Sequence, residues 1–141
     1  MKTALGTLTV SLALAFAVTA CTKNSTTTTA PTTVTRTTDT FTGTVPVKSS
    51  DAHSFPVAQT GQVDATLTAA GPPTTIVMGF AIGTLDASST CVPFAGGSTN
   101  VAAGTAAQLS GIFSPGTLCV QVRDVGNQTA PVTYTVTVTH P

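Results

Sequence analysis

The stretch Val-Thr-Tyr-Thr-Val-Thr-Val-Thr at residues 132–139 decides the fold class of this chain. Apolar side chains alternate strictly with threonine along it, so in an extended chain the two kinds lie on opposite faces. β-Branched and aromatic residues also pack well on a pleated surface. The stretch therefore predicts a β-strand that exposes its threonines and buries the side chains between them, Val132, Tyr134, Val136 and Val138.

Similar segments occur upstream, separated by clusters of turn-forming residues. A chain of 141 residues is long enough for one domain of ordinary size. Residues 41–141 are therefore predicted to fold as an all-β protein, an antiparallel, jelly-roll-like β-sandwich of about seven or eight strands. We expect these strands at residues 41–45, 53–57, 63–67, 75–83, 91–94, 105–113, 116–125 and 131–139.

The segment 75–83 differs from the others because one of its faces is large and the other is small. Its large face consists of Ile76, Met78, Phe80 and Ile82, and its small face includes Gly79, Ala81 and Gly83. Glycine within a strand often marks a place where another backbone approaches closely. We expect a loop or the segment around Cys91 to pack on the small face; the alternative is that this face admits an extended peptide or a glycan.

The composition excludes nucleic acid as an expected partner. The chain carries five basic and five acidic residues, and none of the acidic residues is glutamate. No basic patch is present that would neutralise a phosphate backbone. A domain with so few charges depends on hydroxyl groups and exposed turns for solubility, as is typical of proteins outside the cytoplasm.

The N-terminus has the features of an export signal. Lys2 precedes an apolar run at residues 5–20, which is shorter than the about 20 residues that a membrane-spanning helix needs. The run ends in Val18-Thr19-Ala20-Cys21, which resembles the bacterial lipobox, where small residues precede a cysteine that is lipidated on sulfur. The resemblance implies a signal peptide at residues 1–20, and a Cys21 that anchors the chain to a membrane through lipid. The alternatives are an ordinary cleavable signal and an uncleaved anchor.

Residues 21–40 are expected to form a flexible tether. Twelve of the 21 residues from Thr22 to Thr42 are threonine, and large apolar side chains are almost absent there. Thr22 and Lys23 follow the cysteine without an aspartate, which in a bacterium with two membranes resembles the default route to the outer membrane. We therefore expect a lipid-anchored protein of the cell envelope, outside the cytoplasm.

Two cysteines remain once Cys21 is lipidated. An even number of cysteines in an oxidising compartment favours a disulfide, here between Cys91 and Cys119. Cys119 is out of phase with the apolar residues Leu118, Val120 and Val122, which places the bridge on the outer face of a sheet. Two free thiols are the alternative; a metal site is disfavoured because no histidine adjoins either cysteine.

Three groups of motifs occur together in the predicted strands and turns: Phe-Thr-Gly-Thr-Val at 41–45 with Asp51 and Phe-Pro-Val at 55–57, Thr-Gly-Gln-Val at 60–63, and Gly-Thr-Leu-Cys-Val-Gln-Val at 116–122 with Val-Thr-Tyr-Thr-Val at 132–136. Together they resemble the bacterial pre-peptidase C-terminal domain, a small β-sandwich often appended to secreted peptidases. The resemblance covers about Phe41 to His140 and implies a fold and an accessory role, but no catalytic residue. Relatives have been associated with calcium, protein or matrix binding. The segment 75–80 lacks the acidic residues common in that family.

The sequence offers few groups for catalysis. Asp51 and His53 invite comparison with a Ser-His-Asp triad, but no strained Gly-x-Ser-x-Gly turn accompanies them, and His53 is expected to be a half-exposed strand residue. His140 is penultimate, where fraying is expected. Three further aspartates, Asp64, Asp86 and Asp124, are scattered along the chain. We therefore predict no enzyme activity, no catalytic residue and no cofactor.

Calcium is the metal that the loops would suit best, through Asp124, Asn127 and Asp86. The favoured interpretation is instead that Asp124-Val125-Gly126-Asn127 is a turn whose side chains bond their own backbone, so no metal ligand is assigned. The sequence thus indicates a non-enzymatic envelope lipoprotein whose sandwich is a structural or protein-interaction module. The alternative is a module that binds an envelope glycan, extracellular matrix or calcium.

Overall fold

The computed structural model describes residues 34–141. The predicted signal peptide, Cys21 and the tether up to residue 33 lie outside the described residues. Within residues 34–141 there is no helix that could cross a membrane. The chain forms eight strands in this range: β1 (Thr37–Val45), β2 (Ser50–Val57), β3 (Gly61–Gly71), β4 (Met78–Leu85), β5 (Cys91–Val101), β6 (Leu109–Phe113), β7 (Gly116–Arg123) and β8 (Val132–His140).

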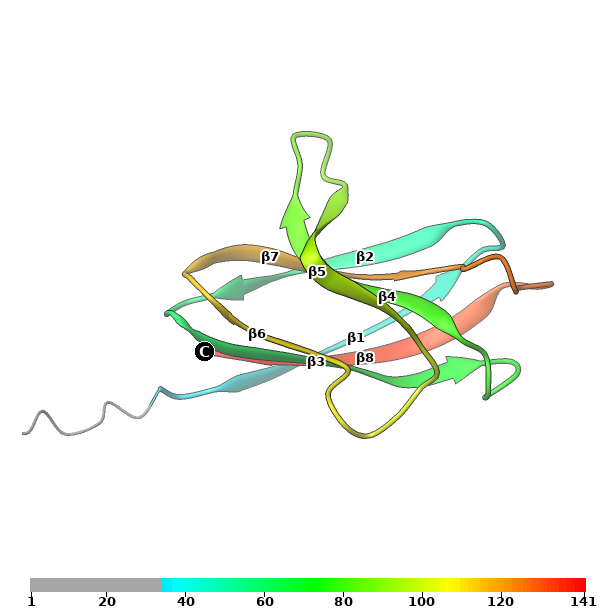
Figure 1. Cartoon of the computed structure of the whole chain (residues 1–141), viewed down its shortest axis with the longest axis horizontal. Coiled ribbons are helices and arrows are strands. Elements are labelled where there is room, and N and C mark those ends of the chain that lie inside the picture. Colours follow the sequence, from blue (N-terminus) through cyan, green and yellow to red (C-terminus); the bar gives the residue numbers. More distant parts are fainter. Residues whose placement is uncertain (1–33) are drawn as a thin grey trace, which may run out of the picture. The chain divides into compact units, whose positions relative to one another are not determined.

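The strands form two four-stranded antiparallel sheets. Sheet A has the order β1-β8-β3-β6, and sheet B has the order β2-β7-β4-β5. Successive strands change from one sheet to the other, except β4 and β5, which pair as a hairpin; this is the connectivity of a jelly roll. Figure 1 shows sheet B stacked above sheet A. The predicted β-sandwich is confirmed.

The core lies between the sheets and is built by the alternation seen in the sequence. The apolar residues of β8 are at most 3% exposed, while the threonines between them reach the surface. Burying one such valine or leucine side chain contributes about 1.5–3 kcal/mol. Phe55, Leu67, Met78, Phe80 and Ile82 are the largest of the other fully buried side chains.

Several strand boundaries differ from the sequence expectation. β1 begins at Thr37, four residues before Phe41, because Asp39 continues the inward face by contacting His140 rather than by being apolar. β6 begins only at Leu109, because Gln108 ends the preceding loop by bonding to β3. Its Oε1 accepts a 2.7 Å hydrogen bond from the Leu67 backbone N–H.

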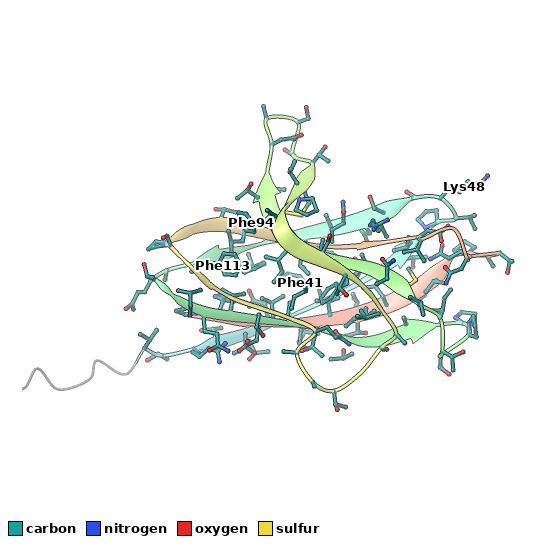
Figure 2. The ribbon with its side chains drawn as sticks, in the orientation of Figure 1. Phe41, Lys48, Phe94 and Phe113 are labelled. Atoms are coloured by element: carbon teal, nitrogen blue, oxygen red, sulfur yellow. A yellow bond between two sulfur atoms is a disulfide. The ribbon has the colours of Figure 1, made fainter. Side chains whose placement is uncertain are left out.

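Strand β5 continues past Phe94 to Val101, with a bulge in its pairing to β4. Ala81 pairs with Ser98 and Gly83 pairs with Pro93, so residues 94–97 bulge opposite Ile82. Phe94 from this bulge packs against Phe113 of β6, with ring centroids 5.3 Å apart. Figure 2 shows these two rings near each other, and both pack against the edge of the core.

The small face of β4 is covered by the protein itself, as predicted. A side chain added at Gly83 would collide with the carbonyl group of Val92, in the segment that follows Cys91. The Arg123 side chain lies over Gly79 in the same way. This stripe of small residues is therefore a packing surface within the fold.

The two ends of the sandwich are different. Thr37 pairs with His140, and the Ala58 N–H donates to the Pro141 carbonyl, so the start of the domain and the C-terminus share one end with the β2–β3 turn. The opposite end, which we call the distal end, consists of the connections at residues 46–49, 72–77 and 124–131. Figure 1 shows the chain entering on the left and these connections on the right.

Candidate functional site

Asp51, His53 and Tyr134 form a polar cluster between the two sheets. Asp51 and His53 lie two residues apart on β2, so both point to the same face, and Tyr134 reaches them from β8. The Tyr134 hydroxyl donates a 2.8 Å hydrogen bond to Asp51 Oδ2, and His53 Nε2 lies 2.9 Å from the same hydroxyl. Phe41 stacks on the His53 ring at a centroid distance of 5.0 Å.

The donors and acceptors in this cluster follow from the single proton of the phenol. Because the Tyr134 hydroxyl donates its hydrogen bond to Asp51, the Tyr134 oxygen accepts a hydrogen bond from His53. The His53 imidazole therefore carries a proton on Nε2. Burial, and then the hydrogen bond and negative charge of Asp51, raise the pKa of Tyr134 well above its ordinary value of 10.0. The cluster therefore holds a neutral tyrosine.

This arrangement suits a structural latch better than a catalytic site. The side-chain hydrogen bonds of Asp51 and His53 run to tyrosine, not to a serine as a Ser-His-Asp triad requires. A phenol with a raised pKa is a poor base or nucleophile near neutral pH. His53 is 30% exposed, as expected for a half-exposed strand residue. The cluster joins sheet A to sheet B along their β1 and β2 edges.

His140 also lies between the two sheets, in contact with β1 and β2. The expectation that this residue frays is wrong. The side chain is only 6% exposed, its Nε2 lies 3.1 Å from Asp39 Oδ2, and its ring packs against Phe55 at a centroid distance of 5.4 Å. Nine consecutive residue pairs between β1 and β8 hold it in the sheet. Position in the sequence alone could not show this pairing.

The other aspartates hold local structure. Asp124 Oδ1 accepts hydrogen bonds from the backbone N–H groups of Gly126, Asn127 and Gln128, while its Oδ2 accepts one of 2.7 Å from Lys48. Together these backbone donors lower the pKa of Asp124. The interpretation of this segment as a self-bonded turn is confirmed. Asp86 likewise accepts 2.8 Å bonds from the N–H groups of Ser88 and Thr90.

Asp64 lies far from these turns, on the outer face of sheet A. Its carboxylate accepts bonds from Gln62, Ser110 and Arg36, with Arg36 Nη2 2.6 Å away. Burial alone would raise the pKa of Asp64, but these hydrogen bonds and the Arg36 charge outweigh it and hold the pKa below 3.8. The structure therefore separates the aspartates rather than pairing them.

The predicted disulfide joins Cys91 to Cys119. Cys119 points away from the core between the sheets, as its phase along β7 predicted, yet it is fully buried because the start of β5 covers it. The bridge thereby fastens the base of the β4–β5 hairpin to β7. Figure 1 shows this hairpin projecting from sheet B.

A groove of about 1000 Å³ lies on the outer face of sheet A near the distal end. The outward threonines of β1 and β8 form its floor, and the turn after β3 forms a wall. The sequence alone does not reveal this groove, because its lining comes from strands β1, β3 and β8, which are separated in the chain and come together only in the fold. Its lining residues are Thr42, Gly43, Thr44, Ala69, Ala70, Gly71, Pro72, Pro73, Thr74, Thr133, Tyr134 and Thr135.

Comparison with known proteins assigns no family to the chain. No protein-family model matches it, and no curated protein matches it either.

Proposed function

We propose that this chain is a lipid-anchored, non-enzymatic protein of the bacterial cell envelope, which presents its β-sandwich as a structural or protein-interaction module. The sequence features that support the anchor are the apolar run at residues 5–20 and the lipobox-like segment that ends at Cys21. The Cys91–Cys119 disulfide supports a location outside the cytoplasm, because such bonds persist in oxidising compartments. The resemblance of the sequence motifs to the pre-peptidase C-terminal domain supports an accessory role for the sandwich.

The interaction role is supported by the hydrogen bonds that hold the three connections of the distal end together. Asp124 ties the β7–β8 connection to Lys48 of the β1–β2 turn, and the Asn127 side-chain amide donates a 2.9 Å bond to the Val77 carbonyl in the β3–β4 connection. These contacts hold three separate connections in one arrangement. Preorganised surfaces lose less entropy on binding a partner.

The distal end also exposes groups suited to contact. Val47 and Val77 are 39% and 38% exposed. Lys48 extends into solvent from the β1–β2 turn, as Figure 2 shows. Because the chain enters the domain at the other end, a partner that binds the distal end does not compete with the tether.

The anchor is tested by growing bacteria that express the full chain with an alkyne-labelled fatty acid. We expect label on the wild-type protein in the membrane fraction and none on Cys21→Ser. Label that persists on Cys21→Ser, or an unlabelled wild-type protein, would contradict the anchor. A hydrolytic turnover of the purified protein that disappears in His53→Ala would contradict the non-enzymatic assignment.

The second candidate function is a module that binds an envelope glycan, extracellular matrix or calcium. The groove on sheet A favours the first of these ligands. The carboxylates of Asp86 and Asp124 already accept hydrogen bonds from the backbone of their own turns. This favours a structural role for both residues over calcium binding.

A further inference from the structure

The groove on sheet A has a floor of hydroxyl and methyl groups. Thr42 pairs with Thr135 and Thr44 pairs with Thr133 in the β1–β8 ladder, and all four side chains point away from the core. Directly paired strands lie about 4.8 Å apart, and residues on one face repeat about every 6.8 Å along a strand. The floor is therefore a small, regular array of threonine side chains.

The wall of the groove is the turn at residues 71–74, and the fold holds it in place. The Thr133 hydroxyl donates a 2.9 Å hydrogen bond to the Gly71 carbonyl, and the Ile76 N–H donates a 3.0 Å bond to the Pro73 carbonyl. The rings of Pro72 and Pro73 and the Thr74 side chain are exposed along this wall. Proline limits the conformations of the turn, so the groove does not need to be ordered by its ligand.

Among the residues that the structure describes, none of those lining the groove carries a charged side chain. A charged ligand would lose hydration there without gaining an ion pair, which disfavours anionic and cationic ligands. Threonine hydroxyls both donate and accept hydrogen bonds, as sugar hydroxyls do. The threonine methyls and the proline rings supply apolar contact for the C–H faces of a pyranose. The volume of about 1000 Å³ is at the upper end of the range for ligand sites and leaves room for more than one sugar unit.

We propose that this groove binds a neutral polysaccharide chain. The inference rests on the proposed display of the domain on the cell envelope and names a ligand class for it. Within residues 34–141, no exposed aromatic ring lines the groove, so each site is expected to bind weakly. Many lipid-anchored copies on one cell would bind a polymer jointly, and the combined binding would be tighter than that of one site.

The proposal is tested by co-sedimentation of the purified full-length protein, in a nonionic detergent, with insoluble cellulose, chitin or starch. We expect at least one of these neutral polymers to retain the wild-type protein, and beads of anionic alginate not to retain it. Thr44→Arg places a long charged side chain in the groove and should lower the retained fraction at least tenfold. Thr38→Arg is the matched control on the same strand and face, outside the lining, and should bind like the wild type.

Thr74→Lys, which lies in the wall and outside any strand, gives the same reading if Thr44→Arg does not fold. Retention by none of the neutral polymers, equal retention of the groove variants, equal loss in Thr38→Arg, or equal retention by alginate would each overturn the proposal. The lipid anchor is tested by fatty-acid labelling of Cys21, and the groove by polysaccharide binding. Because the two measurements are independent, failure of the proposed anchor can be distinguished from failure of the proposed binding groove.

Discussion

Gly43 lies directly opposite Tyr134 in the β1–β8 ladder, and its missing side chain leaves the space in which Tyr134 meets Asp51. A Cβ atom at position 43 would lie 2.7 Å from the Tyr134 hydroxyl and would also collide with the Asp51 carboxylate. The Tyr134 ring is buried between the sheets and has no room to move away. The link between the two sheets therefore depends on a glycine at this position.

We predict that Gly43→Ala lowers the free energy of unfolding by about 1–3 kcal/mol, the usual cost of overpacking a buried site. Urea denaturation followed by circular dichroism measures this change. In an Asp51→Ala background the added methyl group has one obstacle fewer, so the same substitution should cost clearly less. An equal cost in both backgrounds would show that the space is not shared with Asp51.

We predict that Tyr134→Phe lowers the free energy of unfolding by about 1–3 kcal/mol, because it removes the hydrogen bond to a charged carboxylate and leaves His53 without its acceptor. The change is measured by urea denaturation. Thr137→Val is the control on the same strand, on the outer face, and should change stability by less than about 0.5 kcal/mol. If Tyr134→Phe were as stable as the wild type, the hydrogen bonds of Tyr134 to Asp51 and His53 would not stabilise the contact between the two sheets.

Titration of Tyr134 can be followed directly, because it is the single tyrosine of a chain without tryptophan. Its pKa is raised in the folded state, so the folded protein holds the proton more tightly than the unfolded chain does. The corresponding stability is fully present below pH 10 and is lost as the pH rises above it. In urea, we expect the tyrosinate absorbance to appear near pH 10. At the same pH, the native protein should show no tyrosinate absorbance. A native titration that coincides with the one in urea would contradict the raised pKa.

The sequence predicted the strands and their faces well where apolar residues alternate with threonine, as in β8. It predicted less well where polar side chains take the place of apolar ones. Asp39 and His140 form an inward-facing pair, so β1 begins earlier and β8 ends later than apolar alternation suggested. Gln108 bonds to β3 through its side chain, and the loop before it has no strand pairing.

The polar cluster and the groove depend on strand register, which alternation does not determine. The spacing of Asp51 and His53 placed them on one face of one strand, and this could be predicted. That Tyr134 lies within reach of both follows from the pairing of β1 with β8 and from the approach of the β1 edge to β2. The groove depends in the same way on pairing between strands that are distant in the sequence.

Asp64 is expected to make the domain sensitive to acid. Its pKa is lowered in the folded state, so its contribution to stability is present above pH 3.8 and is lost as the pH falls toward the lower folded-state value. We predict that the melting temperature of Asp64→Asn falls less between neutral pH and about pH 2.5 than that of the wild type. Ser110→Ala, which removes one of the donors to the carboxylate, should give an intermediate dependence. Parallel curves for all three proteins would contradict this role.

The Cys91–Cys119 disulfide should contribute a large share of the stability of this domain. The bond closes a loop with a sequence separation of 28, for which the loss of chain entropy in the unfolded state corresponds to about 3–4 kcal/mol. Domains of this size are stable by only about 5–15 kcal/mol. We therefore expect a reductant to lower the urea midpoint of the wild-type protein strongly, and the double variant Cys91→Ala/Cys119→Ala to have a similarly low midpoint that the reductant does not change. If reduction left the wild-type midpoint unaltered, the bridge would not stabilise the fold, and the packing of β5 over β4 and β7 would have to hold the hairpin by itself.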